Sequence, residues 1–168
     1  MAEFLPAFEK MLLDEGGYKL HTVKGDRGGM TYAGIARNAN PGWSGWEQID
    51  NGQTPAAEVV RAFYKAKYWE PIAADGVAHQ SVADSIFNFG VNAGMGTAIK
   101  LAQIVVGATP DGTVGPKTLQ ALNEVNPELF VARYALAKLA RYEQIVSRDR
   151  TQDKFLLGWL RRTLRGAA

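Results

Sequence analysis

The sequence contains no cysteine among its 168 residues. This absence excludes disulfide bridges, cysteine-ligated zinc, iron–sulfur clusters and a thiol nucleophile. The two histidines, His21 and His79, are far apart and lack the spacing of metal ligands, so we expect no metal and no other cofactor. The sequence also lacks a Gly-x-Ser-x-Gly elbow and a glycine-rich loop that could hold phosphate. Catalytic chemistry, if present, therefore falls to carboxylates.

Long apolar runs and targeting signals are missing as well. No stretch approaches about 18 consecutive apolar residues, so the sequence predicts no membrane-spanning helix. Residues 1–10 carry acidic side chains where a secretory signal would carry Lys or Arg, and they lack an unbroken apolar core. We therefore expect a soluble protein, made in the cytoplasm without a signal peptide, that needs a partner to reach any other compartment.

The charge is nearly balanced in total, with 19 basic and 17 acidic residues, but it is unevenly distributed along the chain. Residues 133–168 carry a net charge of +6 and residues 1–132 carry −4. A basic C-terminal segment predicts attraction to a polyanion, such as nucleic acid, an anionic membrane surface or a cell wall rich in carboxylates and phosphates. Two solvated helix faces would explain the same charges.

The spacing of apolar residues predicts a mainly helical chain with a small β-hairpin near the N-terminus. Turn signals between short runs rich in Tyr, Thr and Val place this hairpin, or an irregular β-segment, within residues 18–35. Residues 36–53 are expected to form an ordered loop. The expected helices span residues 4–15, 54–70 with Thr54 as N-cap, 82–89 ended by Gly90, 98–106, 116–122, 126–142 and a last segment that Thr151 caps.

Two carboxylates near the N-terminus stand beside glycine pairs. Glu15 comes at the expected end of the first helix, where the negative end of the macrodipole disfavours an ionised carboxylate, as a general acid requires. Asp26, among glycines and polar groups, is expected to be better solvated and ionised. Two carboxylates in contrasting environments are typical of glycoside hydrolysis. A helix-ending Gly-Gly and an Asp-x-Gly-Gly turn are also common structural features, so the spacing alone leaves both interpretations open.

The opening of glycoside hydrolase family 108 resembles two runs of this sequence, Glu15-Gly16-Gly17-Tyr18 and Asp26-x-Gly28-Gly29-x-Thr31-x-x-Gly34-Ile35. Members of this family are N-acetylmuramidases, found as phage endolysins and as cell-wall enzymes that assist toxin secretion. Further similarities follow in order along nearly the whole chain, at Tyr64-x-x-x-Tyr68-Trp69, Phe89-x-Val91-Asn92-x-Gly94, Leu101-x-x-x-Val105, Asp111-Gly112-x-x-Gly115-x-x-Thr118 and Phe155-Leu156-x-Gly158-Trp159-Leu160-x-Arg162.

The resemblance implies a mainly α, lysozyme-like fold with a small β-hairpin near its catalytic segment. Residues 1–93 would form the catalytic region and residues 94–168 a peptidoglycan-binding region, the two packed as one compact body. Glu15 would protonate the glycosidic oxygen between N-acetylmuramic acid and N-acetylglucosamine. Asp26 and Thr31 would stabilise the oxocarbenium-like state and position the attacking water. For Thr31, a strand residue satisfied by the backbone is the alternative.

Candidate substrate-binding residues are mostly aromatic. The family resemblance adds Tyr18 beside the proposed acid and Tyr68 and Trp69 at the end of a helix. Aromatic rings are natural platforms for sugar faces, although core packing is the more common fate of such residues. Asn92 stands in an apolar, glycine-flanked stretch, where its amide needs a partner such as a substrate N-acetyl group or a structural neighbour.

These inferences predict an endolysin-type muramidase that lyses or remodels the bacterial cell wall. Its partner would be peptidoglycan, and a holin or another pore would bring the monomeric enzyme to it. A non-catalytic peptidoglycan-binding module and a lytic transglycosylase, which also uses one Glu, are the alternatives. A nucleic-acid ligand is not expected, because the basic residues form no recognisable reading motif.

Overall fold

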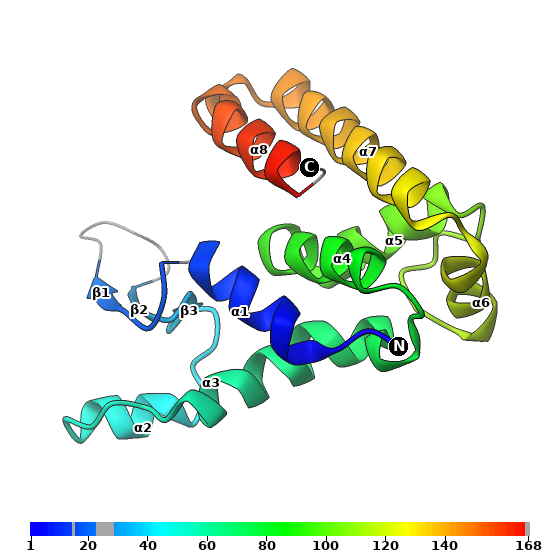
Figure 1. Ribbon diagram of the computed structural model, residues 1–168. Coiled ribbons are helices and arrows are strands. Elements are labelled where there is room, and N and C mark those ends of the chain that lie inside the picture. Colours follow the sequence, from blue (N-terminus) through cyan, green and yellow to red (C-terminus); the bar gives the residue numbers. More distant parts are fainter. Residues whose placement is uncertain (15, 23–28, 167–168) are drawn as a thin grey trace. The chain divides into compact units, whose positions relative to one another are not determined.

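The computed structural model describes residues 1–14, 16–22 and 29–166 (Figure 1). Within these residues the chain is mainly helical, with one small antiparallel sheet near the N-terminus, so the predicted fold class is confirmed. Contacts along the chain group it into two compact units, one of residues Glu3–Glu70 and one of Met1–Ala2 with the residues from Pro71 onward. The functional division at residues 93 and 94 stays a prediction.

The first unit combines three helices with the sheet. It contains α1 (Phe4–Asp14), β1 (Leu20–Thr22), β2 (Met30–Tyr32), β3 (Ile35–Ala36), α2 (Gly45–Asp50), α3 (Ala57–Tyr64) and a π-helical turn (Lys65–Trp69). α1 buries one face, formed by Ala7, Phe8, Met11 and Leu12, as the three- and four-residue spacing predicts.

The end of α1 is formed by local hydrogen bonds. The amide of Gly16 donates to the carbonyl of Leu13, and the amide of Gly17 donates to the carbonyl of Leu12. This pair of bonds is a Schellman motif, which needs a left-handed residue after the helix. Gly16 has φ +87° and supplies it without steric cost, so the Gly-Gly pair ends the helix as predicted.

The second unit contains helices and no strand among its described residues. It contains α4 (Gln80–Ala93), α5 (Met95–Val105), α6 (Pro116–Glu124), α7 (Pro127–Arg148) and α8 (Asp153–Arg165), with short 3₁₀ turns at Ala74–Gly76 and Arg150–Gln152. Asn126 caps α7 as predicted, because its side-chain oxygen accepts a hydrogen bond from the amide of Leu129 at 2.9 Å.

Three predictions about element ends are wrong. α3 begins at Ala57 after Ala56, so Thr54 does not cap it. α4 continues through Gly90 to Ala93; a Cβ at Gly90 would come within 2.2 Å of the Met95 sulfur, so this glycine permits close packing. Thr151 lies in the 3₁₀ turn before α8, where its amide and hydroxyl both donate to the Asp149 carboxylate.

Residues 36–53, predicted as an ordered loop, contain a helix. α2 spans Gly45–Asp50 and begins two positions after Trp43. A Cβ at Gly45 would come within 2.3 Å of that ring, which shows that the indole lies against bare backbone. A six-residue helix has too few turns for a clear apolar period, which explains why the sequence pattern did not reveal it.

Candidate functional site

The sheet of the first unit has two different faces. β1 and β2 pair antiparallel with His21 opposite Thr31, and β2 and β3 pair with Tyr32 opposite Ile35. Residues directly opposite each other share a face, and successive residues alternate between faces. Tyr32 and Ile35 are buried and form the core face. Thr31 therefore lies beside His21 on the other face, where it is half-buried.

A continuous series of aromatic rings connects this sheet with α3. Tyr18 contacts Tyr32 at 6.5 Å between ring centroids, and Tyr32 stacks on Trp43 at 6.1 Å. Trp43 meets Phe63 edge-on at 6.2 Å, and Phe63 meets Tyr68 edge-on at 6.2 Å. Each such pair contributes about 0.5–1.5 kcal/mol beyond burial. We call these five residues the aromatic row.

A buried hydrogen bond holds the sheet to α3. The Tyr64 hydroxyl donates to the Ala33 carbonyl at 2.8 Å. Ala33 and Gly34 both have positive φ, +48° and +78°, which is the backbone of a two-residue type I′ hairpin turn between β2 and β3. The bond thereby stabilises a turn that an alanine adopts at a steric cost, and it sets the position of Thr31 relative to α3.

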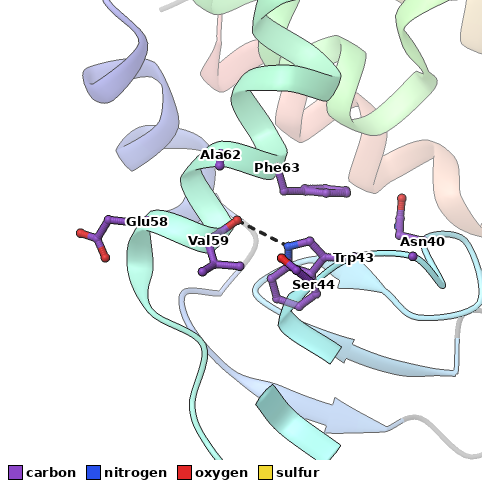
Figure 2. Close-up of a pocket in the computed structure, with 8 residues that line it drawn as sticks. Asn40, Trp43, Ser44, Glu58, Val59, Ala62 and Phe63 are labelled. Atoms are coloured by element: carbon purple, nitrogen blue, oxygen red, sulfur yellow. Dashed lines mark hydrogen bonds between the residues drawn. The ribbon is translucent and has the colours of Figure 1, made fainter. Parts of the chain in front are cut away.

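A pocket of about 690 Å³ lies beside the aromatic row. Its lining comes from the segment before α2 and from α3: Asn40, Gly42, Trp43, Ser44, Glu58, Val59, Ala62 and Phe63. Figure 2 shows Trp43 donating through Nε1 to the Val59 carbonyl, a bond of 3.4 Å, while Glu58 points away from the rings. The volume falls within the range of about 300–1,000 Å³ typical of small-ligand sites.

An ammonium group also lies beside this pocket. Lys67 donates a hydrogen bond to the side-chain oxygen of Asn40, which lines the pocket. Its Nζ also lies 5.2 Å from the Phe63 ring centroid and 5.7 Å from that of Tyr68. Aromatic faces, an amide and a cation are the groups that bind a sugar ring bearing amide or carboxylate substituents.

A bidentate ion pair supports the segment that carries the pocket. Arg37 donates to both carboxylate oxygens of Asp50, at 2.7 and 2.6 Å, and its guanidinium lies 5.3 Å from the Trp46 ring centroid. The hydrogen bond from Arg37 lowers the pKa of Asp50 below its ordinary value. The pair therefore connects the end of β3 with the end of α2 at neutral pH.

The predicted site residues lie in different surroundings. Tyr18 is 41% exposed at one end of the aromatic row, and Tyr68 is half-buried at the other end. Trp69 is fully buried and meets Phe4 edge-on at 5.6 Å, so its ring serves the core. Asn92 is exposed on α4 of the second unit, where its amide nitrogen donates to the Asn88 carbonyl at 2.8 Å.

Two of the predicted site residues, Glu15 and Asp26, lie outside the described residues. Of the remaining candidates, the aromatic row includes Tyr18 and Tyr68 and passes through Tyr32, the neighbour of Thr31. Their roles in binding or catalysis stay predictions.

Sequence reasoning missed the pocket residues Asn40, Trp43 and Phe63. The signal was present, because Trp43 and Trp46 stand close together in a segment with no other apolar periodicity. Two tryptophans in such a segment indicate an anchored structure rather than a solvated loop. Within the part of the chain that the structure describes, no group of three His, Asp or Glu side chains could hold a metal ion, and no helix is long and apolar enough to span a membrane.

Comparisons with known proteins agree with the resemblance found in the sequence. The family described as Glycosyl hydrolase 108 matches residues 8–94, and the family described as Predicted Peptidoglycan domain matches residues 97–164. Among solved structures, the chain is similar to Brucella abortus SagA, with 29% sequence identity and a TM-score of 0.74 over 98% of this chain and 91% of that one. No curated protein sequence matches significantly.

Proposed function

Because the chain belongs to the glycosyl hydrolase 108 family, we propose that this glycoside hydrolase is an N-acetylmuramidase that cleaves the β-1,4 bond between N-acetylmuramic acid and N-acetylglucosamine of bacterial peptidoglycan. The observation that carries the proposal is the succession of a glycosyl hydrolase segment, residues 8–94, and a predicted peptidoglycan domain, residues 97–164. A glycoside hydrolase that is joined to a peptidoglycan domain acts at the cell wall, where peptidoglycan is found.

Glu15 is the general acid of this proposal. In the sequence it directly follows Asp14, the last residue of α1. Near a helix C-terminus the macrodipole favours the protonated carboxyl group, which a general acid needs before it transfers its proton to the glycosidic oxygen. Since Glu15 lies outside the described residues, its role rests on this sequence position and on the family resemblance.

Asp26 and Thr31 complete the proposed chemistry. As the glycosidic bond breaks, positive charge develops on the sugar ring, and an ionised Asp26 stabilises it. Thr31 positions the attacking water through its hydroxyl; its place on the half-buried face of β2, away from the core residues Tyr32 and Ile35, supports this role. Asp26, like Glu15, lies outside the described residues.

The aromatic row and its pocket provide the substrate contacts of the proposal. Tyr18, three positions after Glu15 in the sequence, is the exposed end of the row. Sugar rings stack on aromatic faces, and the amide of Asn40 can accept or donate a hydrogen bond to an N-acetyl group. Tyr68 is proposed as a further contact, as is Asn92 from the second unit.

The test is digestion of purified peptidoglycan by wild type, E15Q and a matched control, E9Q. Glu9 is exposed on α1, so E9Q makes the same change of one carboxylate to an amide on the same helix. General acid catalysis contributes about 10²–10⁴-fold, so we expect E15Q to lose at least about 100-fold in rate and E9Q to keep the wild-type rate.

Mass spectrometry of the released sugar ends distinguishes the reaction types. Reducing N-acetylmuramic acid ends support the proposed muramidase. Anhydro-muramic acid ends would show a lytic transglycosylase, and reducing N-acetylglucosamine ends a different bond. If wild type releases no fragments, the protein is a binding module. Full activity of E15Q would refute the assignment of Glu15.

The biological setting follows as part of the same proposal. We place the enzyme in wall lysis or remodelling, in the manner of a phage endolysin, with delivery to the wall through a holin or another pore. We also propose that it acts as a monomer. Light scattering on the purified chain tests the monomer, and lysis that requires a co-expressed pore protein tests the delivery.

A further inference from the structure

The second unit contains a separate pocket of about 830 Å³ between α7, α8 and the end of α4. Its aromatic lining is a stack of three rings. Tyr142 on α7 stacks on Trp159 of α8 with ring centroids 5.0 Å apart and an interplanar angle of 24°, and Trp159 stacks on Phe155 at 6.0 Å and 28°. Tyr142 is buried, whereas Phe155 is 46% exposed, so the stack leads from the core to the surface.

Five cationic side chains line the same pocket: Arg141, Lys154, Arg161, Arg162 and Arg165. No carboxylate is among the residues that line it. We call the pocket with its aromatic stack and these cations the α7–α8 groove. Such an excess of one charge around a hollow attracts an anionic ligand and raises its local concentration.

The acidic residue that follows α7 in the chain is engaged elsewhere. Asp149 accepts hydrogen bonds from the hydroxyl and amide of Thr151 and from the Gln152 side chain, which lower its pKa below the ordinary value. Among the described residues, Arg141 and Arg161 form no ion pair within 4.0 Å. These two guanidinium groups are therefore available for an external carboxylate.

We propose that the α7–α8 groove binds the carboxylate-bearing peptides of peptidoglycan, an inference that rests on the proposed substrate and adds a binding site to it. An arginine fork matches a carboxylate bidentately, and aliphatic peptide segments pack on the exposed rings. Several cations spread around one apolar stack suit a chain with several separate carboxylates better than a single phosphate. The groove therefore recognises the peptide part of the polymer, whereas Tyr18 and Tyr68 of the first unit are proposed to contact its glycan.

The proposal predicts which part of the polymer the second unit needs. The experiment uses the full chain carrying E15Q, which prevents digestion, and measures its binding to purified peptidoglycan freed of other wall polymers. R141Q/R161Q removes two charges from the groove. The matched control R133Q/R148Q removes two charges from exposed positions of α7 outside the groove. Circular dichroism verifies that both variants keep the helical fold.

We expect R141Q/R161Q to lose about tenfold or more in affinity, because a hydrogen bond to a charged group contributes enough for that factor. R133Q/R148Q should lose much less. Binding to glycan strands whose peptides have been removed with an amidase should fall to a similar level without any change to the protein. This arm does not depend on how the variants fold.

Several results would overturn the proposal. Equal losses in both double variants would indicate diffuse charge attraction instead of a groove. Unchanged affinity of R141Q/R161Q, or unchanged binding to peptide-free strands, would exclude peptide recognition. Binding to vesicles of anionic phosphatidylglycerol that is tighter than binding to peptidoglycan, and is lost in R141Q/R161Q, would assign the groove to a lipid surface. Digestion by E15Q would instead refute the assignment of Glu15 and leave the groove to be decided by binding.

Discussion

Lys138 on α7 has its ammonium group in an unusual place for a lysine. The residue is 8% exposed, and Nζ lies 4.6 Å from the ring centroid of Tyr134 and 5.3 Å from that of Phe89. Burial lowers the pKa of Lys138 from an ordinary value of 10.5 to about 8. Folding therefore favours the neutral amine more than the unfolded chain does. At neutral pH, below the pKa, the folded state still carries the charge, and this charge is poorly solvated.

The sign of the pH dependence follows from this preference. Between the folded pKa of about 8 and the unfolded value of 10.5, the unfolded chain binds more protons at Lys138 than the folded chain does. The contribution of Lys138 to stability is thus least favourable below pH 8 and improves as the pH rises through this window. At about 1.4 kcal/mol per pH unit, the pKa shift from 10.5 to about 8 lowers the free energy of unfolding by about 3 kcal/mol when Lys138 is charged. The cation–π contacts with the two rings offset about 1–2 kcal/mol of this penalty.

We therefore expect K138M to unfold with a higher free energy than wild type at pH 7, by about 1–3 kcal/mol, because methionine fills the same space without a charge to desolvate. By pH 9.5 this advantage should shrink by about 1–2 kcal/mol. Urea denaturation at both pH values measures it. Burial also raises the pKa of Tyr134 and Tyr142, but both proteins contain these residues, so their effect cancels in the difference.

The matched control is K117M, which replaces an exposed lysine of α6 and should stay within about 0.5 kcal/mol of wild type at either pH. A K138M advantage that is equal at pH 7 and pH 9.5 would refute the reasoning, since Lys138 would then stay charged in the folded state throughout. A loss of stability in K138M at pH 7 would show that the cation–π contacts exceed the desolvation penalty.

Three further variants test the packing. G45A places a methyl group 2.3 Å from a buried Trp43 ring and should cost about 1–3 kcal/mol, with a shifted tryptophan emission spectrum as evidence that the pocket changed. Q103L removes a buried side chain that accepts a hydrogen bond from one backbone amide and donates to three acceptors around the α5–α6 turn. We expect the free energy of unfolding, measured with urea, to fall by about 3 kcal/mol. The exposed control Q120L should lose less than about 0.5 kcal/mol. Y64F leaves a buried carbonyl without its donor and should cost about 1–2 kcal/mol in the same assay.

Much of the helical architecture was predictable from short stretches of sequence. The apolar spacing of α1 and the Gly16–Gly17 pair after it describe a helix and its end completely, since every bond involved joins residues at most five positions apart. Asn126 likewise caps α7 through a neighbour three residues on. At Gly90 the prediction was wrong, because the helix continues through a glycine against which the Met95 side chain packs, and the glycine alone does not distinguish such packing from a helix end.

The candidate site was predictable in part. The family resemblance singled out Tyr18, Thr31 and Tyr68, and the structure connects Tyr18 with Tyr68 through the aromatic row. It did not single out Trp43, because the value of that ring comes from its contacts with Tyr32 and with residues of α3, far along the chain. No local pattern predicts contacts between residues so distant in sequence.

The sequence by itself indicated the family of this protein through its motif residues, and the absence of cysteine excluded thiol chemistry. Only the tertiary structure decided which aromatic side chains remain open to a ligand. Judged from the sequence, Trp69 and Tyr18 are equally suited to bind a sugar ring. In the structure, however, Trp69 is fully buried and Tyr18 is 41% exposed. The reason is physical: residue type sets what a side chain can do, whereas burial depends on the sum of contacts that distant segments make around it.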